Sequence, residues 1–315
     1  MDKIVLAVDL GGTKLRMAAV GAGGEVVARS KSATPRSDDP RDIVEAIIAS
    51  AGDCHDPGAP EYDIQAIGIA IPAMSIGAGG IVNKAANLPS LDGFALAPAV
   101  AEKLGVPAVL ENDANAAAIG ENWIGASRGI GNSICVTLGT GVGGGIILNG
   151  SALRGPDWSA GEIGHICVEP LGPPCGCGSN GCVEQYSSAT AIVRMAREIM
   201  GNYPASELHG KFELSAFDVH EAGKSGDELA GEVFRLMGQY LGIALAGLIN
   251  VLNPEVIVIG GGVAAGWDLF IGHVRDEIEK RAYCEPAKRA KLVRALLGDD
   301  AGILGAARVA FGSGK

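Results

Sequence analysis

Three cysteines and a histidine lie close together in this sequence, at a spacing that suits a metal ion. Cys175, Cys177 and Cys182 fall within eight residues and follow shortly after His165. Four nitrogen and sulfur ligands are what a closed tetrahedral Zn²⁺ site takes, and the intervening glycines permit tight wrapping. We therefore predict a structural zinc site without an open coordination position for water. The alternative is a group of buried thiols that hold no ion.

Two carboxylates flank this cluster. Glu162 belongs to the segment GEIGH that ends in His165, and Glu184 follows the last cysteine of the cluster. We predict that the metal positions both carboxylates to accept hydroxyl groups of a sugar. His165 could bind zinc through one ring nitrogen and donate to the sugar through the other. Alternatively, both glutamates are surface charges, which is the commoner fate of a lone glutamate.

A further carboxylate stands where a predicted strand ends. The strand 106–113 closes in Asn112 and Asp113, and a helix follows directly. Ligands gather at the carboxyl ends of such strands. We predict that Asp113 accepts the proton of a sugar hydroxyl that attacks a γ-phosphate, while Asn112 binds a neighbouring hydroxyl. The alternative is that Asp113 only caps the helix, since aspartate is a preferred N-cap residue.

The first glycine-rich turn joins two predicted strands. Its residues are Asp9, Gly11, Gly12, Thr13 and Lys14. Glycines allow backbone amides to approach an anion, and the lysine adds a positive charge, so we predict a phosphate-binding loop. The aspartate could hold a hydrated Mg²⁺. A plain hairpin turn is the alternative.

A second turn, at 138–145, contains the spacing G-x-G-x-x-G. It continues into an apolar strand. A dinucleotide-binding fingerprint would instead open a helix at this point. We predict instead a hairpin loop whose Thr140 and Gly141 donate to a nucleotide. A glycine turn that only tolerates close packing is the alternative.

A third glycine run, Gly261, Gly262 and Val263, lies between a predicted strand and helix. This context matches G-x-G-x-x-A better. However, no second strand ending in an acid follows to hold a ribose, so dinucleotide binding stays a minor alternative. A purine or ribose lying on the turn explains the same residues, and the three loops together predict ATP between two lobes.

The order of predicted elements indicates an α/β protein with two lobes and an internal duplication. Strands are expected within 4–10, 15–20, 25–34, 66–73, 106–113, 133–148, 255–263 and 292–297, and helices within 40–50, 95–104, 115–123, 189–200, 227–252, 267–281 and 301–311. Residues 4–20 and 133–148 share the order strand, turn, strand. We expect a first lobe at 1–113, with 300–315 packing back on it, and a second lobe at 114–299 that contains the zinc motif. A cleft between two lobes is an expected ligand site.

Composition narrows the function classes. The formal net charge is −11, which argues against a nucleic-acid partner. The 48 glycines and 4% aromatic residues favour close backbone packing. The first strand follows Met1–Lys3 directly, so we expect no signal peptide, and the apolar run 241–252 is shorter than the about 20 residues that span a bilayer. We therefore expect a cytoplasmic protein without a membrane partner, whose clustered cysteines serve a metal.

Together these residues resemble the ROK family, which comprises sugar kinases and sugar-responsive repressors of the actin-like ATPase superfamily. The resemblance spans essentially the whole chain. It rests on DLGGTK at 9–14, GIAIPA at 68–73, ENDANAAA at 111–118, LGTGVGGG at 138–145, GEIGH at 161–165, CGCGSNGC at 175–182 and GGGV at 260–263. It implies a two-lobed actin-like ATPase fold, also called ribonuclease H-like.

The resemblance also implies roles for individual residues. Asp113 is similar to the family's catalytic base. Sugar ligands are implied at Asn112, Glu162, His165 and Glu184, and Asn87 lies in another segment that approaches the sugar. Near that segment the chain departs from many relatives, because Ser90 and Leu91 stand where they carry Gly-Trp, and Ala73 stands where they carry glycine.

By this resemblance we expect an ATP-dependent hexose kinase that phosphorylates the 6-hydroxyl of glucose, with structural Zn²⁺ and with Mg²⁺ accompanying ATP. N-acetylhexosamine, mannose, fructose and allose stay open as substrates, and polyphosphate stays open as a donor. A sugar-sensing regulator is the less favoured class, because repressors of this family carry a helix-turn-helix before the first phosphate strand. Relatives are often dimers or tetramers, which implies a homo-oligomer.

Overall fold

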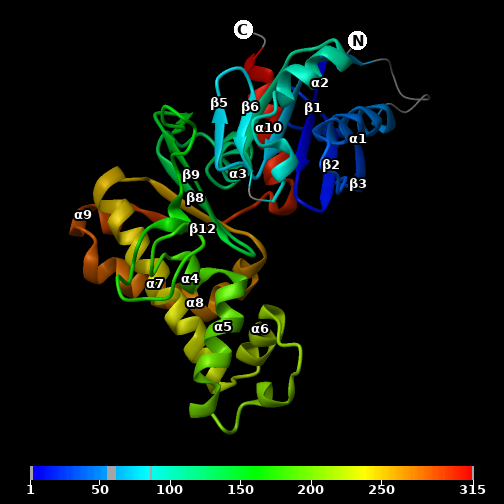
Figure 1. Ribbon diagram of the computed structural model, residues 1–315. Coiled ribbons are helices and arrows are strands. Elements are labelled where there is room, and N and C mark those ends of the chain that lie inside the picture. The colour runs from blue at the N-terminus through cyan, green and yellow to red at the C-terminus, as the bar shows by residue number, and fades with distance from the viewer. Residues whose placement is uncertain (1–2, 55–61, 86, 314–315) are drawn as a thin grey trace. The chain divides into compact units, whose positions relative to one another are not determined.

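The protein is described from a computed structural model, which describes residues 3–54, 62–85 and 87–313. The chain forms two compact units (Figure 1). The first comprises Met1–Gly131, Gly145–Gly161 and Leu296–Lys315, and the second comprises Asn132–Gly144 and Glu162–Ala295. Each unit contains residues that the sequence singles out, so each is described in turn.

The first unit is built on a five-stranded sheet. In order across the sheet, its strands are β3 (Val26–Ala33), β2 (Lys14–Gly21), β1 (Lys3–Leu10), β4 (Asp63–Ile71) and β7 (Ala108–Asn112). β1, β2 and β3 form an antiparallel meander, and β4 and β7 continue the sheet parallel to β1. The carboxyl ends of β1, β4 and β7 therefore meet at one edge, where Asp9 and Asp113 are placed.

The two faces of this sheet carry different cores. Alternate side chains of a strand point to opposite faces, so Ile4, Leu6 and Val8 of β1 join one core, and Val5 and Ala7 join the other. Helices α1 (Pro40–Asp53) and α2 (Leu96–Leu104) cover the first face, and α3 (Asp113–Trp123) and α10 (Ala301–Ser313) cover the second. Smaller elements of this unit are β5 (Ser75–Gly77), β6 (Ile81–Lys84), η1 (Pro89–Leu91) and η6 (Gly298–Asp300).

The second core is rich in alanine and glycine, and α3 and α10 pack backbone against backbone. A Cβ atom added to Gly305 of α10 would lie 1.7 Å from the carbonyl oxygen of Ala116 in α3. Only a residue without a side chain allows this approach. The close packing that the glycine-rich composition predicts is therefore concrete at this helix pair.

The packing of α3 also explains where the units divide. The sequence predicts a boundary after residue 113, with 300–315 returning to the first lobe. The structure draws the boundary elsewhere, because α3 packs on α10 and on β4, and the segment Gly145–Gly161 joins the same unit. A strand–helix junction looks like a boundary in sequence, but tertiary packing keeps both elements together.

The second sheet repeats the plan of the first. Its order is β10 (Ser151–Ala152), β9 (Val142–Leu148), β8 (Ser133–Leu138), β11 (Val256–Gly260) and β12 (Lys291–Arg294), and the division between the units falls within β9. β11 lies parallel to both β8 and β12, as β4 lies parallel to β1 and β7. The duplicated motif that the sequence predicts is confirmed.

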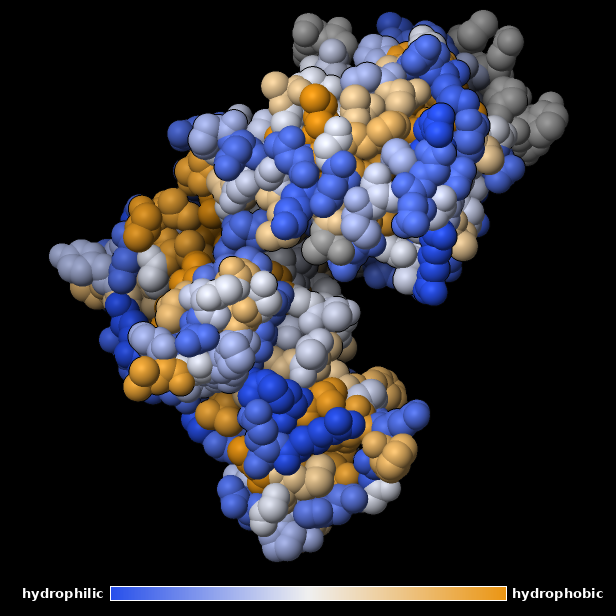
Figure 2. Space-filling model, in the orientation of Figure 1, coloured by the Kyte–Doolittle hydropathy of each residue, from blue (hydrophilic) through white to orange (hydrophobic). Residues whose placement is uncertain are grey.

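The second unit, all of whose residues the structure describes, contains six α-helices, and the longest, α7 (Glu228–Leu252), lies at the centre of their contacts. They are α4 (Glu184–Ser187), α5 (Ala189–Ile199), α6 (Ala216–Lys224), α7, α8 (Trp267–Arg281) and α9 (Cys284–Arg289), with the 3₁₀ segments η2 (Ile163–His165), η3 (Met200–Asn202), η4 (Glu207–Gly210) and η5 (Gly262–Gly266). Figure 1 shows α7 and α8 side by side, and their contact is extensive. On the face shown in Figure 2, hydrophobic atoms reach the surface over α6.

Helix α7 is long and apolar enough to cross a membrane by length and composition alone. Its buried side chains, such as Phe234, Leu241 and Leu245, pack instead within the second unit. The helix contacts α4, α5, α6 and α8. It therefore has the character of a core helix, as the sequence predicts.

Candidate functional site

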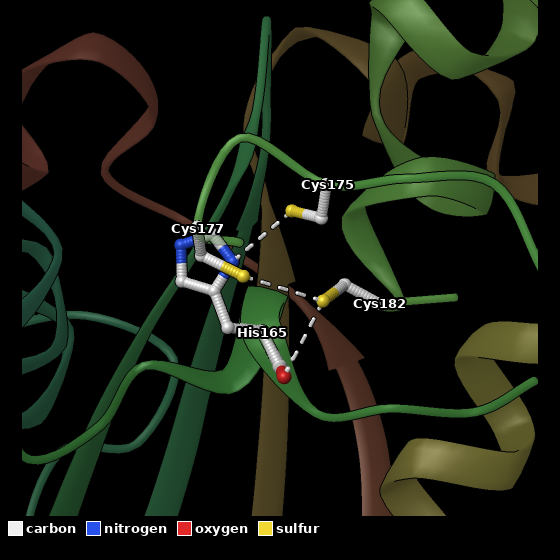
Figure 3. Close-up of side chains that lie close together, drawn as sticks. All are labelled: His165, Cys175, Cys177 and Cys182. Atoms are coloured by element: carbon white, nitrogen blue, oxygen red, sulfur yellow. Dashed lines mark hydrogen bonds between the residues drawn. The ribbon is translucent and has the colours of Figure 1, made fainter. Parts of the chain in front are cut away.

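The predicted metal ligands come together in the second unit. Ligand atoms of His165, Cys175, Cys177 and Cys182 all lie within 4.8 Å of one another, and Figure 3 shows their side chains pointing toward a common centre. Cys175 Sγ is 3.6 Å from His165 Nδ1, and the sulfur atoms of Cys177 and Cys182 are 3.7 Å apart. A tetrahedral ion with bonds of about 2.3 Å has ligand atoms about 3.7 Å from each other. The four residues therefore fit a tetrahedral metal ion.

The backbone around the cysteines is folded tightly enough to require glycine. The amide of Cys175 donates to the carbonyl of Ser179, and the amide of Gly181 donates to the carbonyl of Pro173. Gly181 has a φ of +62°, and a Cβ atom there would lie 1.6 Å from the carbonyl oxygen of Glu169. Burial raises the pKa of the Cys182 thiol to about 12, so a bound cation would have to displace its proton.

His165 connects the cluster to the first of the two carboxylates. Its Nδ1 faces Cys175, and its Nε2 lies 3.9 Å from Glu162 Oε2. This orientation is compatible with the prediction that one ring nitrogen binds zinc and the other donates to the sugar. Burial raises the pKa of Glu162, and the nearby Glu184 carboxylate acts in the same direction. His165 lowers the pKa, but the net shift is upward. The glutamate side chain remains 47% exposed, so it is open to a ligand.

The second carboxylate belongs to both the metal-binding segment and a glycine loop. Glu184 begins α4, and its Oε2 accepts a hydrogen bond of 3.0 Å from the amide of Val142, at the start of β9. A Cβ atom added to Gly141 would lie 2.4 Å from the same oxygen. Glu184 is therefore held against the turn between β8 and β9, a contact that the sequence did not reveal.

A cavity of about 360 Å³ lies beside this turn, entirely within the second unit. Thr140, Gly262 and Val263, three of the residues that the sequence predicts to bind a nucleotide, line it. Gly141 and Gly261 are not among the lining residues, although each adjoins one. The volume falls within the range of small-molecule sites, about 300–1,000 Å³. The two glycine segments, more than a hundred residues apart in sequence, thus share one concave surface.

The cavity has walls that the sequence analysis missed. Phe217 and His220 of α6 and Phe234 of α7 also line it. Aromatic side chains suit a purine because both present flat faces. Nothing in the pattern of 216–224 distinguishes a cavity wall from an ordinary amphipathic helix.

The third glycine run confirms the strand–turn–helix context. η5 follows β11 and leads into α8, and β12 then returns parallel to β11. β12 ends at Arg294, with Ala295 after it. No carboxylate stands at the end of this strand to hold a ribose, so the chain lacks this part of the dinucleotide-binding pattern.

In the first unit, Asn112 and not Asp113 is the residue that caps helix α3. Asn112 is the N-cap of α3, and its Oδ1 accepts from the amides of Ala114 and Asn115 at 2.9 and 3.0 Å. Its Nδ2 donates to the carbonyl of Ala73. Asp113 is the first helical residue, and its Oδ1 also accepts from the amide of Ala114. The cap that we considered for Asp113 thus belongs to Asn112.

Behind these residues lies a buried ion pair that sequence reasoning missed. Arg154 donates through Nε and Nη2 to Glu111 Oε2, at 2.8 and 2.6 Å, and the glutamate side chain is only 1% exposed. Burial raises the pKa of Glu111 above its usual value, and the positive charge of Arg154 offsets only part of this increase. Glu111 also accepts from the amide of Asn112. The pair therefore supports the turn that presents Asp113.

The first glycine loop is a compact hairpin in the same unit. The amide of Gly11 donates to the carbonyl of Lys14, and Thr34 Oγ1 donates to the carbonyl of Gly11. Thr13 and Lys14 are exposed. A Cβ atom on Gly12 would lie 3.1 Å from the carbonyl oxygen of Asn87, so the segment containing Asn87 lies against the loop. The two predicted stretches are therefore neighbours.

Asp9 has a partner that the sequence did not predict. Its carboxylate accepts a hydrogen bond from Arg16 on the neighbouring strand β2. The first residues of α10 lie close by, since a Cβ atom on Gly302 would be 3.7 Å from Asp9 Cγ. A cation at Asp9 would have to share the carboxylate with Arg16.

Known proteins place this chain in a family. The family model described as ROK matches residues 5–312. A glucokinase from Halalkalibacterium halodurans is 39% identical over 96% of this chain and 94% of its own length, and one from Thermotoga maritima is 34% identical over 97% and 96%. A solved ROK family glucokinase from Streptomyces griseus, in complex with glucose and AMPPNP, matches with a TM-score of 0.81 at 35% identity over 98% of this chain and 99% of that chain. The two-lobed actin-like ATPase fold is thereby confirmed, and the chain belongs to the ROK family.

Proposed function

We propose that this protein is an ATP-dependent hexose kinase that transfers the γ-phosphate of ATP to the 6-hydroxyl of glucose. The observation that carries the proposal is in the second unit. There the Cys/His cluster lies beside the carboxylates Glu162 and Glu184, and Glu184 accepts a hydrogen bond from the amide of Val142, in the turn whose Thr140 lines the cavity. The related glucokinases, including the structure that holds glucose and AMPPNP, support glucose as acceptor and ATP as donor.

In this proposal the first unit supplies the chemistry of proton transfer. Asp113 accepts the proton of the 6-hydroxyl as its oxygen forms the new bond to the γ-phosphorus, and the bond from phosphorus to the oxygen of the leaving ADP breaks. The loop from Gly11 to Lys14 contacts phosphate, with Gly12 and Thr13 offering backbone amides. Asn87, which lies against this loop, contributes to the sugar pocket.

The second unit supplies recognition. Glu162 and Glu184 accept hydroxyl hydrogens of the sugar, and His165 donates through Nε2. Asn112 contributes from the first unit through its remaining amide hydrogen, because its Oδ1 is occupied by two backbone amides. Thr140 and Gly141 bind phosphate oxygens, and the segment Gly261, Gly262 and Val263 carries the nucleoside.

We infer that the metal held by the four-residue cluster is Zn²⁺ and that its role is structural. Its ligand set of one histidine and three cysteines is typical of closed zinc sites. Mg²⁺ accompanies ATP, with Asp9 as its proposed carboxylate, and when bound it neutralises charge on the phosphates. The seven cysteines, which all lie among the described residues, form no disulfide, and this suits a cytoplasmic enzyme. We further propose a homo-oligomer, which sedimentation of the purified protein would test.

The kinase proposal is tested over a sugar panel, by ADP release when ATP is the donor and by formation of sugar phosphate when polyphosphate is the donor. Glucose, mannose, fructose, allose and N-acetylmannosamine are compared at equal concentration, with ATP or polyphosphate as donor, with and without Mg²⁺. We expect glucose and ATP to give the highest kcat/KM and the reaction to require Mg²⁺. If no sugar stimulates ADP release, the kinase proposal is wrong. If another hexose is preferred by tenfold or more, only the assignment of glucose is wrong.

A further inference from the structure

A separate cavity, of about 590 Å³, lies within the first unit. Its walls come from α3, from the loop after α3, from the segment 147–154 and from α10. None of the residues assigned above to sugar, phosphate or metal lines it. Its size is that of a small-molecule site.

The cavity is basic in a protein that is otherwise acidic. Arg128, Arg154 and Arg308 line it, and no lining residue is an aspartate or glutamate, although the chain carries a net charge of −11. In the described part of the chain, neither Arg128 nor Arg308 makes an ion pair. The Arg308 guanidinium lies 5.6 Å from the centre of the Trp123 ring, which orients it along the wall. Arginine forks of this kind recognise phosphate oxygens.

The third arginine connects the cavity to the catalytic turn. Arg154 uses Nε and Nη2 to hold the buried Glu111, and its Nη1 has no hydrogen bond to the described residues. Glu111 accepts from the amide of Asn112, the residue that caps α3 beside Asp113. One guanidinium therefore faces both a cavity and the support of the proposed base.

We propose that this cavity binds a small phosphorylated molecule through Arg128, Arg154 and Arg308, and that binding lowers turnover through the Arg154–Glu111 pair. A second anion on Arg154 shares the charge that neutralises Glu111. A buried carboxylate with a weakened partner is destabilised, so the turn that presents Asp113 loosens. This inhibitory effect rests on the proposed kinase function, whereas binding itself does not.

Binding is tested with tryptophan fluorescence. The chain has three tryptophans, so the double variant W158F/W267F leaves Trp123, on the cavity wall, as the only one. This protein is titrated with inorganic phosphate and with glycerol 3-phosphate, and calorimetry on the unaltered protein checks the midpoints. We expect a saturable change, and a tighter midpoint for glycerol 3-phosphate indicates an organic phosphate ester as the ligand class.

Variants assign the binding to the cavity. Arg128→Gln and Arg308→Gln should each weaken binding about tenfold or more, because each removes a charge-assisted hydrogen bond. Arg275→Gln, an arginine beside a different cavity in the second unit, is the matched control and should leave the midpoint unchanged. The site is wrong if neither probe gives a saturable change, or if Arg128→Gln and Arg308→Gln leave the midpoint where it was.

Coupling is tested by turnover at saturating glucose and ATP. Added phosphate compound should lower kcat with the midpoint found by fluorescence, and Arg128→Gln should keep its basal kcat while shifting that midpoint about tenfold upward. Binding without any change in kcat would overturn the link through Arg154. A protein that shows no kinase activity with any sugar would instead overturn the proposed function, and the fluorescence titration would still decide whether the cavity binds phosphate.

Discussion

The two five-stranded sheets share a plan but differ in what stands at the ends of their strands. In the first sheet, β1 ends near Asp9, and β7 leads into Asp113. In the second, β8 ends at a glycine turn, and β12 ends at Arg294 without a carboxylate. The strand orders of the two sheets correspond, so the fold alone does not determine which residues stand at the strand ends or which chemistry they support.

The difference indicates how a duplicated scaffold divides its work. Carboxylates at a strand edge suit proton transfer and cation binding, whereas bare glycine turns suit a nucleotide that approaches the backbone. The second unit gains its own carboxylates, Glu162 and Glu184, from the segment 162–184 that carries the metal cluster and not from a strand end. We therefore expect damage to the first sheet's edge to affect turnover, and damage to the second unit to affect binding.

The strand ends provide the largest expected effect. Asp113→Asn should lower kcat by about 10²–10⁴-fold, because the amide cannot accept the hydroxyl proton. Arg294→Gln, at the corresponding strand end of the second sheet, is the matched control and should change kcat by less than about threefold. Among the described residues, the exposed Arg294 side chain forms an ion pair only with Asp268 and a ring contact only with Trp267. Both are measured by ADP release at saturating substrates. Near-normal turnover of a folded Asp113→Asn variant would remove the residue from the role of base.

Loss of the metal should have an effect nearly as large, but on the binding of glucose and not on turnover. Cys182→Ser removes a fully buried ligand, so we expect the metal content to fall from about one zinc per chain, the melting temperature to drop by several degrees, and the KM for glucose to rise about 10–100-fold. Metal content is measured by mass spectrometry of the purified protein, and KM by ADP release. Cys284→Ser, an exposed thiol of the same unit, should change none of these. Unchanged glucose KM in a protein verified to be metal-free would separate the cluster from sugar binding.

These outcomes also measure how far the sequence could lead. The metal ligands were predictable because their chemistry is local, with four specific side chains within eighteen residues. The strands and helices were predictable from periodicity and glycine turns. The choice between Asn112 and Asp113 as N-cap was not, because both residue types cap helices and only the extended backbone of Asn112, with ψ 142°, decides between them.

Contacts between segments that are distant along the chain could not be predicted from the sequence. Nothing near Arg154 indicates that it would reach Glu111, and nothing near Val142 indicates that its amide would bind Glu184. Such pairs depend on how the sheets and the segments between them pack, and a single sequence carries no direct record of that packing. The same holds for Asp9, whose pairing with Arg16 follows from strand register and not from the glycine motif.

Two neighbouring glycines of the second sheet's turn sharpen the comparison further. Gly141→Ala places a Cβ 2.4 Å from Glu184 Oε2, so the carboxylate must move, and we expect the KM for glucose to rise about tenfold. Gly139→Ala meets no atom within 4 Å but lines the cavity that we propose for the nucleotide, so it should raise the KM for ATP and leave that for glucose unchanged. Initial rates over both substrates distinguish the variants. Identical profiles would show that the turn does not separate the two substrates.

The smallest effect concerns an aromatic ring that the protein leaves open. Phe217 is 70% exposed on α6, where Figure 2 shows hydrophobic atoms at the surface, and it lines the cavity that we propose for the nucleotide. An exposed ring contributes little to folding, so Phe217→Ala should leave the melting temperature within about two degrees of the original. If the ring covers the purine, the KM for ATP should rise about fivefold, or about 1 kcal/mol, with kcat and the glucose KM unchanged. Phe212→Ala, an even more exposed ring that does not line this cavity, should alter neither KM. Equal behaviour of the two variants would show that α6 is only a neighbour of the nucleotide and that the glycine turns bind it alone.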